Sequence, residues 1–411
     1  MSELSYLEKL LDGVEVEWKT LEDITLRTSN IKWREVIRSY RYIDLTSVDI
    51  ATKKITETTE ITKNNAPSRA QKLVDENDVI FATTRPTQQR FCLIDSEYAG
   101  EVASTGYCIL RAKQDQVLPK WILHWISTSD FKKHVEENQS GSAYPAISDS
   151  KVKECLIPIP CPDNPEKSLA IQSEIVRILD KFTALTAELT AELNMRKKQY
   201  NYYRDQLLSF DEEQEKPIYL EKLLDGVEVE WLPLSDLARI RNGKDHKSLS
   251  EGEFPVYGSG GIMRYVDTYA YNKPSVLIPR KGSLGNLFFI DVPFWTVDTI
   301  FYTEIDEAQI RPKYLYYFLS TVGLGEMNQA GGVPSQTQSV LNKLKIPIPC
   351  PDNPEKSLAI QSEIVRILDK FDTLTNSITE GLPREIELRQ KQYEYYRDLL
   401  FSFPKPETAS N

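Results

Sequence analysis

Two stretches of the chain carry apolar residues at alternating spacings of three and four, the pattern of a helix that buries one stripe. The stripe runs from Ile171 to Leu207 in the first stretch and from Ile360 to Leu400 in the second. Both are longer than an ordinary globular helix of roughly 8–20 residues. The pattern predicts two long helices packed as an antiparallel coiled coil. Two helices that each complete the core of their own domain are the alternative.

Particular residues are expected to shape these helices. The predicted seam includes Ile175, Phe182, Leu189 and Leu193 in the first helix, and Ile364, Phe371 and Leu382 in the second. Ser168 is the expected N-cap of the first helix. The tetrad Thr-Ala-Glu-Leu occurs twice in tandem at 186–193, a four-residue stutter that locally unwinds a supercoil. Gly381 and Pro383 predict a kink or an interruption in the second helix.

Short apolar runs that precede each long helix predict strands. They lie at Asp78–Thr83, Phe91–Asp95 and Gly106–Ala112, and again at Ser275–Pro279, Leu287–Asp291 and Thr299–Ile305. Each set is followed by a helical pattern, which begins at Leu118 or at Lys313. The expected fold class is therefore α/β, with two globular α/β domains separated by the two long helices.

Three segments of the sequence occur twice. YLEKLLDGVEVEW stands at Tyr6–Trp18 and Tyr219–Trp231, IPIPCPDNPEKSLAIQSEIVRILDKF at Ile157–Phe182 and Ile346–Phe371, and a similar tail at Gln199–Phe210 and Gln392–Phe403. We call these segments the frames. The inserts that they enclose, Lys19–Leu156 and Leu232–Lys345, share no comparable run. The pattern indicates a pseudo-twofold internal repeat, in which the frames have one constant role and the inserts have two variable ones.

The repeat also predicts where domains begin and end. The first insert domain is expected at 1–156 and the second at 217–345. Each is followed by a proline-rich hinge and a helical segment, at 157–216 and 346–411. The middle of each insert holds a polar, partly basic loop between its first two predicted strands, and such loops on rigid sheets commonly carry recognition residues.

Charge is distributed unevenly between the frames and the inserts. The formal net charge of −11 argues against a simple electrostatic nucleic-acid binder, but basic residues gather in the inserts. Arg, Lys, Gln, Asn and Ser are the residue types that contact base edges and phosphates. A solvated basic face without a ligand is the alternative. The candidate DNA contacts are Arg27, Lys32, Arg34, Arg38, Arg41, Arg85, Gln88, Gln89, Arg90, Arg241, Lys244, Arg280, Lys281, Ser283 and Asn286.

Motifs for catalysis and cofactor binding are not found in the sequence. It contains no phosphate-binding loop, HExxH zinc motif, GxSxG elbow or Rossmann fingerprint, and its five cysteines and three histidines lack zinc-site spacing. We therefore expect no catalytic residue, cofactor or metal in this chain. Neither a signal peptide nor an 18-residue apolar run is present, which predicts a cytoplasmic protein without a membrane span.

The tandem TAEL, the IPIPCP segment and the KQYxYYRDxL tails resemble the specificity subunits (HsdS) of type I restriction-modification enzymes, most closely the IC subfamily. The resemblance implies that each insert is a target recognition domain for one half of a bipartite site in double-stranded DNA. It also implies that the helices set the spacer and dock two modification subunits, which methylate adenine with S-adenosylmethionine. Two restriction subunits, which use ATP and Mg, would complete the complex.

The tandem tetrad is expected to act as a ruler. One tetrad adds a net helical rotation of about 40°, close to the roughly 35° that one base pair adds to B-DNA. One tetrad should thus correspond to one base pair of spacer. A coiled-coil scaffold that joins two protein-binding domains without nucleic acid is the alternative function.

Overall fold

A computed structural model describes residues 13–210, 222–224, 227–327, 334–377 and 379–405. The chain divides into two compact units. The first unit comprises Met1–Thr190 with Glu385–Asn411, and the second comprises Ala191–Arg384. Each unit therefore contains one insert together with parts of both frames.

The described residues of the first unit form three sheets, with strand orders β2-β9-β6-β7, β4-β3-β8-β5 and β1-β10. The strands are β1 (Val16–Thr20), β2 (Thr25–Leu26), β3 (Tyr40–Ile43), β4 (Thr59–Ile61), β5 (Ala70–Leu73), β6 (Val79–Ala82), β7 (Phe91–Leu93), β8 (Val102–Ser104), β9 (Tyr107–Ala112) and β10 (Leu156–Pro160). The helices of the insert are the 3-10 turn η1 (Pro86–Gln88), α2 (Pro119–Trp125), α3 (Ser129–Asn138) and α4 (Asp149–Lys153). The predicted runs Asp78–Thr83, Phe91–Asp95 and Gly106–Ala112 are confirmed as β6, β7 and β9.

Where the structure describes it, the second unit also forms three sheets, ordered β12-β18-β15-β16, β14-β13-β17 and β11-β19. The strands are β11 (Val229–Pro233), β12 (Ala238–Asn242), β13 (Phe254–Gly258), β14 (Gly261–Val266), β15 (Ser275–Pro279), β16 (Phe288–Ile290), β17 (Trp295–Thr296), β18 (Ile300–Ile305) and β19 (Lys345–Pro349). Its short helices are α7 (Leu234–Leu237), α8 (Pro312–Leu319), η2 (Leu324–Glu326) and α9 (Gln338–Leu341). The predicted strands of this insert are confirmed as β15, β16 and β18.

The sheet that carries the basic loop has the same strand order in both inserts, although the inserts share no comparable run of sequence. In each unit the strand before the basic loop lies between the long strand β9 or β18 and the short strand β7 or β16. A second sheet in each unit contains one parallel pair, β3 with β8 and β13 with β17. The α/β class and the internal repeat predicted from the sequence are therefore confirmed.

The repeated proline-rich segments, for which the sequence predicts hinges, form strands that are each followed by a turn. β10 pairs antiparallel with β1, with Trp18 opposite Pro158, and β19 pairs in the same way with β11. The turn that follows β10 contains Cys161 at φ 48°. The Cys161 amide donates to the carbonyl of Glu15 at 2.8 Å. Each frame thus clamps the two ends of its insert together.

The N-cap of the first long helix is Asn164, so the prediction of Ser168 is wrong. The Asn164 side chain accepts a hydrogen bond from the Lys167 amide at 3.0 Å, and Asn353 caps the second copy in the same way. Ser168 lies one turn further on and is buried. Its hydroxyl accepts a hydrogen bond from Gln172 at 3.1 Å.

The first predicted long helix is continuous, whereas the second is interrupted. α5 runs from Pro165 to Ser209. The second copy forms α10 (Pro354–Asn376) and α11 (Gly381–Leu400). Gly381 has φ +81°, and a Cβ atom at this position would lie 2.4 Å from the Thr373 carbonyl oxygen. The glycine therefore permits the break, while Pro383 is tolerated in the first turn of α11 because the amide it lacks has no helical partner there.

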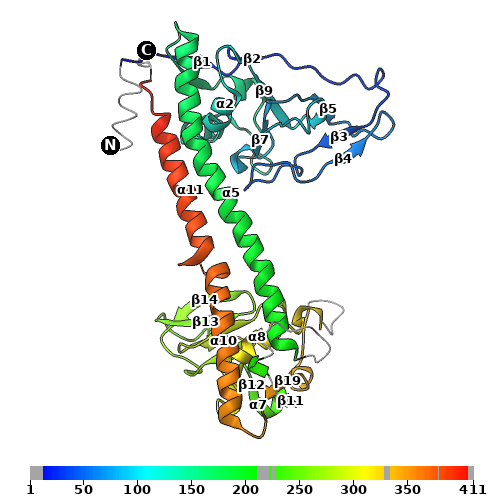
Figure 1. Ribbon diagram of the computed structural model, residues 1–411, viewed down its shortest axis with the longest axis vertical. Coiled ribbons are helices and arrows are strands. Elements are labelled where there is room, and N and C mark those ends of the chain that lie inside the picture. The colour runs from blue at the N-terminus through cyan, green and yellow to red at the C-terminus, as the bar shows by residue number, and fades with distance from the viewer. Residues whose placement is uncertain (1–12, 211–221, 225–226, 328–333, 378, 406–411) are drawn as a thin grey trace. The chain divides into compact units, whose positions relative to one another are not determined.

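Within each unit the frame helices lie antiparallel and also enter the core. Figure 1 shows α11 beside the first part of α5 and α10 beside its last part. In the first unit Phe182 stacks on Tyr396 with ring centroids 5.3 Å apart. In the second unit Phe371 stacks on Tyr200 and Tyr203. The structure combines the predicted helix pair with its alternative, because the same helices also complete the domain cores.

The core of the first unit forms between the β2-β9-β6-β7 sheet and the helices. Val79 and Phe81 of β6 face α2, α3 and α5, while Ile80 and Ala82 face the second sheet. The frame residues of this core are Ile157, Ile159, Ile171, Ile175, Val176, Leu179, Leu400, Phe401 and Phe403. In the second unit the frame residues of the core are Leu207, Leu208, Phe210, Ile346, Ile348, Ile360, Ile364 and Leu368. The core of the first unit is thus completed by the C-terminal end of α11, and the core of the second unit by the C-terminal end of α5.

A substitution of Phe401 tests whether this end of the second frame completes the first core. Its ring is 2% exposed and lies 4.5 Å from Trp121 and 5.5 Å from Trp125, measured between ring centroids. We expect Phe401→Ala to destabilise the first unit by about 3–5 kcal/mol, because it leaves a cavity between two tryptophans. Urea unfolding followed by tryptophan fluorescence measures the effect. The half-exposed Leu185→Ala is the control and should cost less than about 1 kcal/mol. Equal losses in the two variants would contradict this role of Phe401.

Candidate nucleic-acid interface

The loop between β6 and β7, Thr83–Arg90, is held in a fixed shape. Arg85 and Gln89 have φ of 49° and 53° and flank the 3-10 turn η1. The Gln88 amide donates to the Arg85 carbonyl at 3.0 Å, and the Gln89 amide donates to the Pro86 carbonyl at 3.0 Å. Two non-glycine residues in the left-handed region are unusual in one short loop, and such conformations cluster at functional sites.

Four candidate residues of this loop differ in where their polar groups lie. Arg85 and Gln88 are exposed. Arg90 instead donates to the carbonyls of Leu45 and Val48, so its guanidinium connects two segments of the unit. Both amide atoms of Gln89 are buried and have no hydrogen-bond partner. The loop therefore presents Arg85 and Gln88 to solvent.

Lys53 is a cation of this region that the sequence analysis missed. Its ammonium donates to the Gln89 carbonyl and lies 4.3 Å from the centre of the Phe91 ring. Burial lowers the pKa of Lys53 to about 8, an effect that Asp49 opposes and Arg90 reinforces. No sequence pattern signals this contact, because Lys53 and Gln89 belong to segments far apart in the chain.

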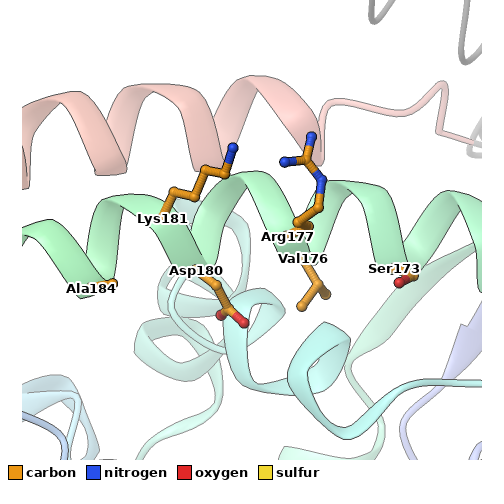
Figure 2. A pocket seen from close by; sticks show the side chains of 6 residues that line it. All are labelled: Ser173, Val176, Arg177, Asp180, Lys181 and Ala184. Atoms are coloured by element: carbon orange, nitrogen blue, oxygen red, sulfur yellow. The ribbon is translucent and has the colours of Figure 1, made fainter.

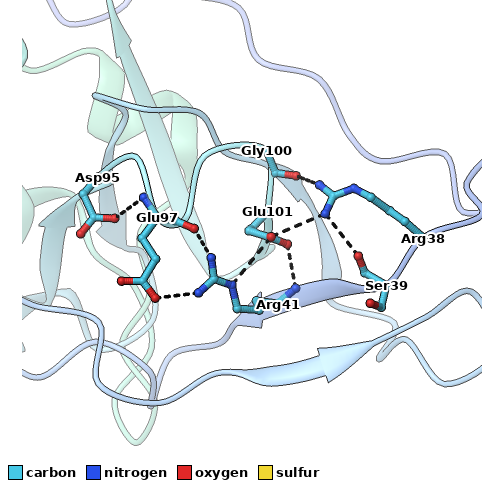
Figure 3. A network of polar contacts seen from close by, with 7 residues as sticks. All are labelled: Arg38, Ser39, Arg41, Asp95, Glu97, Gly100 and Glu101. Atoms are coloured by element: carbon cyan, nitrogen blue, oxygen red, sulfur yellow. Dashed lines mark hydrogen bonds and ion pairs between the residues drawn. The ribbon is translucent and has the colours of Figure 1, made fainter.

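The basic side chains of segment 27–41 differ in whether they bond to a distant part of the chain. Arg27, Lys32 and Arg34 are exposed, and Lys32 lies 3.5 Å from the carboxylate of Glu35. Figure 3 shows Arg38 and Arg41 on either side of the buried carboxylate of Glu101. Of these five candidate DNA contacts, Arg38 and Arg41 therefore also hold a loop, although Arg38 is itself exposed.

The Glu101 carboxylate organises that network. Arg38 and Arg41 approach it at 3.5 Å and 3.7 Å, and the Arg41 amide donates to it at 2.7 Å. Arg38 also donates to the Gly100 carbonyl at 2.7 Å, and Arg41 pairs with Glu97 at 2.8 Å. A buried carboxylate needs such partners, since an unpaired one would be strongly destabilising.

The candidates of the second insert are mostly exposed. Lys244, Lys281, Ser283 and Asn286 lie at the surface, whereas Arg241 and Arg280 are half-buried. Arg241 pairs with Glu304 at 3.0 Å, and Lys281 lies 3.8 Å from Asp298. Asn286 donates to the Ser259 carbonyl at 3.3 Å. Whether any of these side chains touches DNA stays a prediction.

The predicted seam residues fall into two groups. Ile175 and Ile364 are fully buried in the cores of the two units. Phe182 and Phe371 stack on tyrosines of the neighbouring helix. Leu189, Leu193 and Leu382 are half-buried. A charge at Ile175 or Ile364 would therefore disrupt a domain core as well as a helix pair.

A polar joint that sequence reasoning did not anticipate attaches each frame to its insert. Gln172 accepts from the Leu118 amide at 2.9 Å and donates to the Gln116 carbonyl at 3.0 Å. Gln361 makes the corresponding two bonds with Arg311 and Gln309, at 2.8 Å and 3.1 Å. The glutamine that recurs in both frames thus hydrogen-bonds to the backbone of each insert, immediately before α2 in the first and before α8 in the second.

A repeated aspartate completes each joint. Asp180 accepts from Lys120 at 2.6 Å and contacts His124 Nε2 at 3.0 Å, while Asp369 accepts from Lys313 at 2.8 Å and the Tyr317 hydroxyl at 2.6 Å. Burial opposes ionisation of Asp180, but the hydrogen bonds from His124 and Lys120 outweigh it and lower the carboxyl pKa. Burial and the bond to Asp369 raise the pKa of Tyr317.

The N-terminal half of α5 carries a shallow surface pocket beside this joint. Figure 2 shows its lining, with Arg177 and Lys181 on the opposite side of the helix from Val176 and Asp180. The other two lining residues are Ser173 and Ala184. Five of the six residue types recur on α10, where Thr373 replaces Ala184. Both units therefore present nearly the same helix surface.

Three further observations concern membrane-spanning helices, metal ligands and cysteine thiols. Across the described part of the chain, no helix combines the length and apolarity needed to span a membrane. The same residues include no grouping of His, Cys, Asp and Glu that could hold a metal ion. Burial raises the pKa of the thiols of Cys92, Cys108 and Cys155 to about 12, so these thiols are protonated at neutral pH.

Duplicated helical frames that carry two α/β domains with unlike polar loops define the architecture, and comparisons with known proteins identify its family. The family model described as "Type I restriction modification DNA specificity domain" matches residues 15–196 and 226–388. The chain is 41% identical over 446 aligned positions to the EcoR124I/EcoR124II specificity subunit of Escherichia coli, covering 100% of both chains. It is 34% identical to the EcoprrI specificity subunit of Escherichia coli, covering 92% of this chain and 93% of that relative.

A solved structure supports the same fold. A chain from a study of complex assembly and conformational transition of the type I restriction-modification system has a TM-score of 0.60 and 20% identity, over 94% of this chain and 97% of that one. This chain belongs to the family of type I restriction-modification DNA specificity subunits. The family favours a role in DNA sequence recognition over a protein scaffold without nucleic acid.

Arg85 and Arg90 provide a paired test of the loop. Arg90→Ala should lower the stability of the first unit by about 1–3 kcal/mol, because two carbonyls lose their charged donor. Arg85→Ala should leave stability within about 0.5 kcal/mol of the parent, because its side chain is exposed. Urea unfolding curves of both variants measure the difference. A larger loss for Arg85→Ala than for Arg90→Ala would contradict these assignments.

Proposed function

We propose that this chain is the DNA-reading subunit of a type I restriction-modification complex, with one half of a bipartite duplex site read by each unit. The observation that carries the proposal is the combination of one topology with two different loop surfaces. The first unit presents Arg85 and Gln88 on its β6–β7 loop, and the second presents Lys281, Ser283 and Asn286 after β15. Arg, Lys, Gln and Asn discriminate base pairs through the hydrogen-bonding groups of the major groove.

The repeated helix surface supports two copies of the same partner. Lys167, Ser173, Arg177 and Lys181 are exposed on α5, and the identical residue types Lys356, Ser362, Arg366 and Lys370 are exposed on α10. Folding alone constrains exposed positions weakly, so identity at these positions suggests a common binding partner. We infer that each surface binds one modification subunit, because identical surfaces present identical side chains to identical partners.

The chemistry of the complex is assigned to the partner subunits. In this proposal the modification subunits methylate adenine with S-adenosylmethionine, and the two restriction subunits use ATP and Mg to translocate and cleave DNA. The present chain supplies recognition and spacing without a catalytic residue of its own. The tandem tetrads at 186–193 lie within the uninterrupted α5, and their correspondence to spacer length stays a prediction.

Replacement of one insert tests the bipartite reading. A chain whose Lys19–Leu156 is replaced by the insert of another specificity subunit should change one half of the methylated site and retain the other. The reason is that each unit holds its own recognition loops on a separate sheet. Sequencing of methylated adenines in cells that also express the modification partner gives the result.

The control for this exchange is a reciprocal replacement of Leu232–Lys345, which should change the other half only. Binding of duplex DNA by the purified complex should also fall steeply with salt, because phosphate contacts release counterions. A change in both halves after one replacement, or a complex without sequence preference, would refute the proposed function.

Charge reversal on the repeated helix surface tests the docking of modification subunits. Lys181→Glu or Lys370→Glu should weaken one of two binding events at least tenfold, and the double variant should weaken both, because a reversed charge opposes the partner surface. Native mass spectrometry at limiting concentration counts the modification subunits bound to each chain.

The matched control is Lys197→Glu, an exposed lysine of α5 whose counterpart in the second frame is Gln390. This variant should retain two modification subunits. Circular dichroism should show unchanged helicity for all variants. Full assembly of the double variant would remove this surface from the interface.

A further inference from the structure

The β6–β7 loop is bound at its first three residues, Thr83–Arg85, by a second segment, Gln139–Ile147, which the sequence analysis did not connect with it. The Arg85 amide donates to the Pro145 carbonyl at 2.7 Å, and the Ile147 amide donates to the Thr83 carbonyl at 2.9 Å. Thr84 and Ala146 form an isolated β-bridge between these bonds. The two segments therefore form one rigid surface.

The second unit repeats this connection between loop and second segment, the loop joint, with different residues. The Gly282 amide donates to the Pro334 carbonyl at 2.9 Å, and the Gln336 amide donates to the Arg280 carbonyl at 3.0 Å. Lys281 and Ser335 form the corresponding β-bridge. The links common to both units use main-chain groups, so they persist while the side chains around them differ. In the second unit the Gln336 side chain also donates to the Pro279 carbonyl. Such a constant support under variable side chains is suited to recognition.

Tyr144 stands at the tip of the second segment in the first unit. Its side chain is 71% exposed, and the Arg85 guanidinium lies 5.2 Å from the centre of its ring. Ser140 and Ala146 exchange two backbone hydrogen bonds, at 2.8 Å and 2.9 Å, which close the turn beneath the ring. Gly141 has φ +95°, and a Cβ atom there would lie 2.9 Å from the Tyr144 carbonyl oxygen. The backbone thus fixes the position of a ring that solvent surrounds.

We propose that Tyr144 is a specificity-determining residue of the first unit, which contacts DNA beside the base pair that Arg85 reads. This inference rests on the proposed function. A guanidinium over an aromatic face is restrained by the cation–π attraction, and its edge N–H groups stay available to the O6 and N7 acceptors of guanine. The exposed edge of the tyrosine ring then packs on the neighbouring sugar or thymine methyl in the groove.

The second unit supports this assignment by contrast. Gly282 makes the backbone bond that Arg85 makes in the first unit, so no cation occupies this position. Lys281, the residue before Gly282, lies 3.8 Å from Asp298. The same joint therefore carries an arginine and a tyrosine in one unit and a glycine beside a lysine in the other. The two halves of the DNA site should accordingly differ at the base pairs that this surface faces.

The test uses the full chain in complex with its modification subunits and a set of duplexes that vary each base pair of the mapped first half-site. Tyr144→Ala should weaken binding about tenfold on the preferred site and flatten the preference at one or two adjacent base pairs. Tyr144→Phe should retain both affinity and preference, because the ring alone makes the contact. Arg85→Ala should relax the neighbouring position, and the double variant should lose less than the product of the single losses.

Two controls separate this inference from the proposed function. Tyr202→Ala removes a tyrosine of similar exposure from α5 and should leave base preference unchanged, and preference in the second half-site should be unchanged in every variant. Unaltered preference in Tyr144→Ala, or an equal loss on all duplexes, would overturn the role of Tyr144 and leave the proposed function standing. Absence of any sequence preference in the parent complex would refute the proposed function itself.

Discussion

The structure depends on one constraint, which is that a single helix surface must pack against two different inserts. Ile171, Ile175 and Leu179 fill the first core, and the same residue types at Ile360, Ile364 and Leu368 fill the second. Burial of each such side chain contributes about 1.5–3 kcal/mol, so these positions tolerate little change. The inserts have adapted to this surface by keeping one sheet order, while their other residues have diverged.

The polar joint shows how that adaptation leaves the inserts free to vary. On the insert side, Gln172 and Gln361 bond to main-chain groups, which every amino acid except proline supplies in full. Asp180 and Asp369 accept from a lysine in both units, but their second partner is a histidine in one and a tyrosine in the other. A carboxylate accepts from any donor of suitable position, so the frame does not prescribe the side chain that meets it.

Much of this architecture could be predicted from the sequence, because its repeats and apolar runs are local signals. The helices, the strands around each basic loop and the interruption near Gly381 all follow from patterns within a few residues. The failures involve long-range contacts. Arg85 and Arg90 are arginines of the same loop, and nothing in the sequence distinguishes their roles. Only the fold brings Arg90 to the carbonyls of Leu45 and Val48. Tyr144 gives no signal, since its relation to Arg85 arises from bonds between segments distant in the chain.

The two kinds of joint explain how specificity could change without loss of the fold. Where an insert meets its frame, conserved chemistry is confined to an apolar helix face, a glutamine and an aspartate. Where the insert forms its proposed reading surface, the supporting bonds at Thr83, Arg85 and Pro145 are again main-chain bonds. Side chains at this surface contribute little to folding and can be exchanged at small cost in stability. Because neither joint depends on the identity of the exposed residues, new recognition chemistry can arise on an unchanged scaffold.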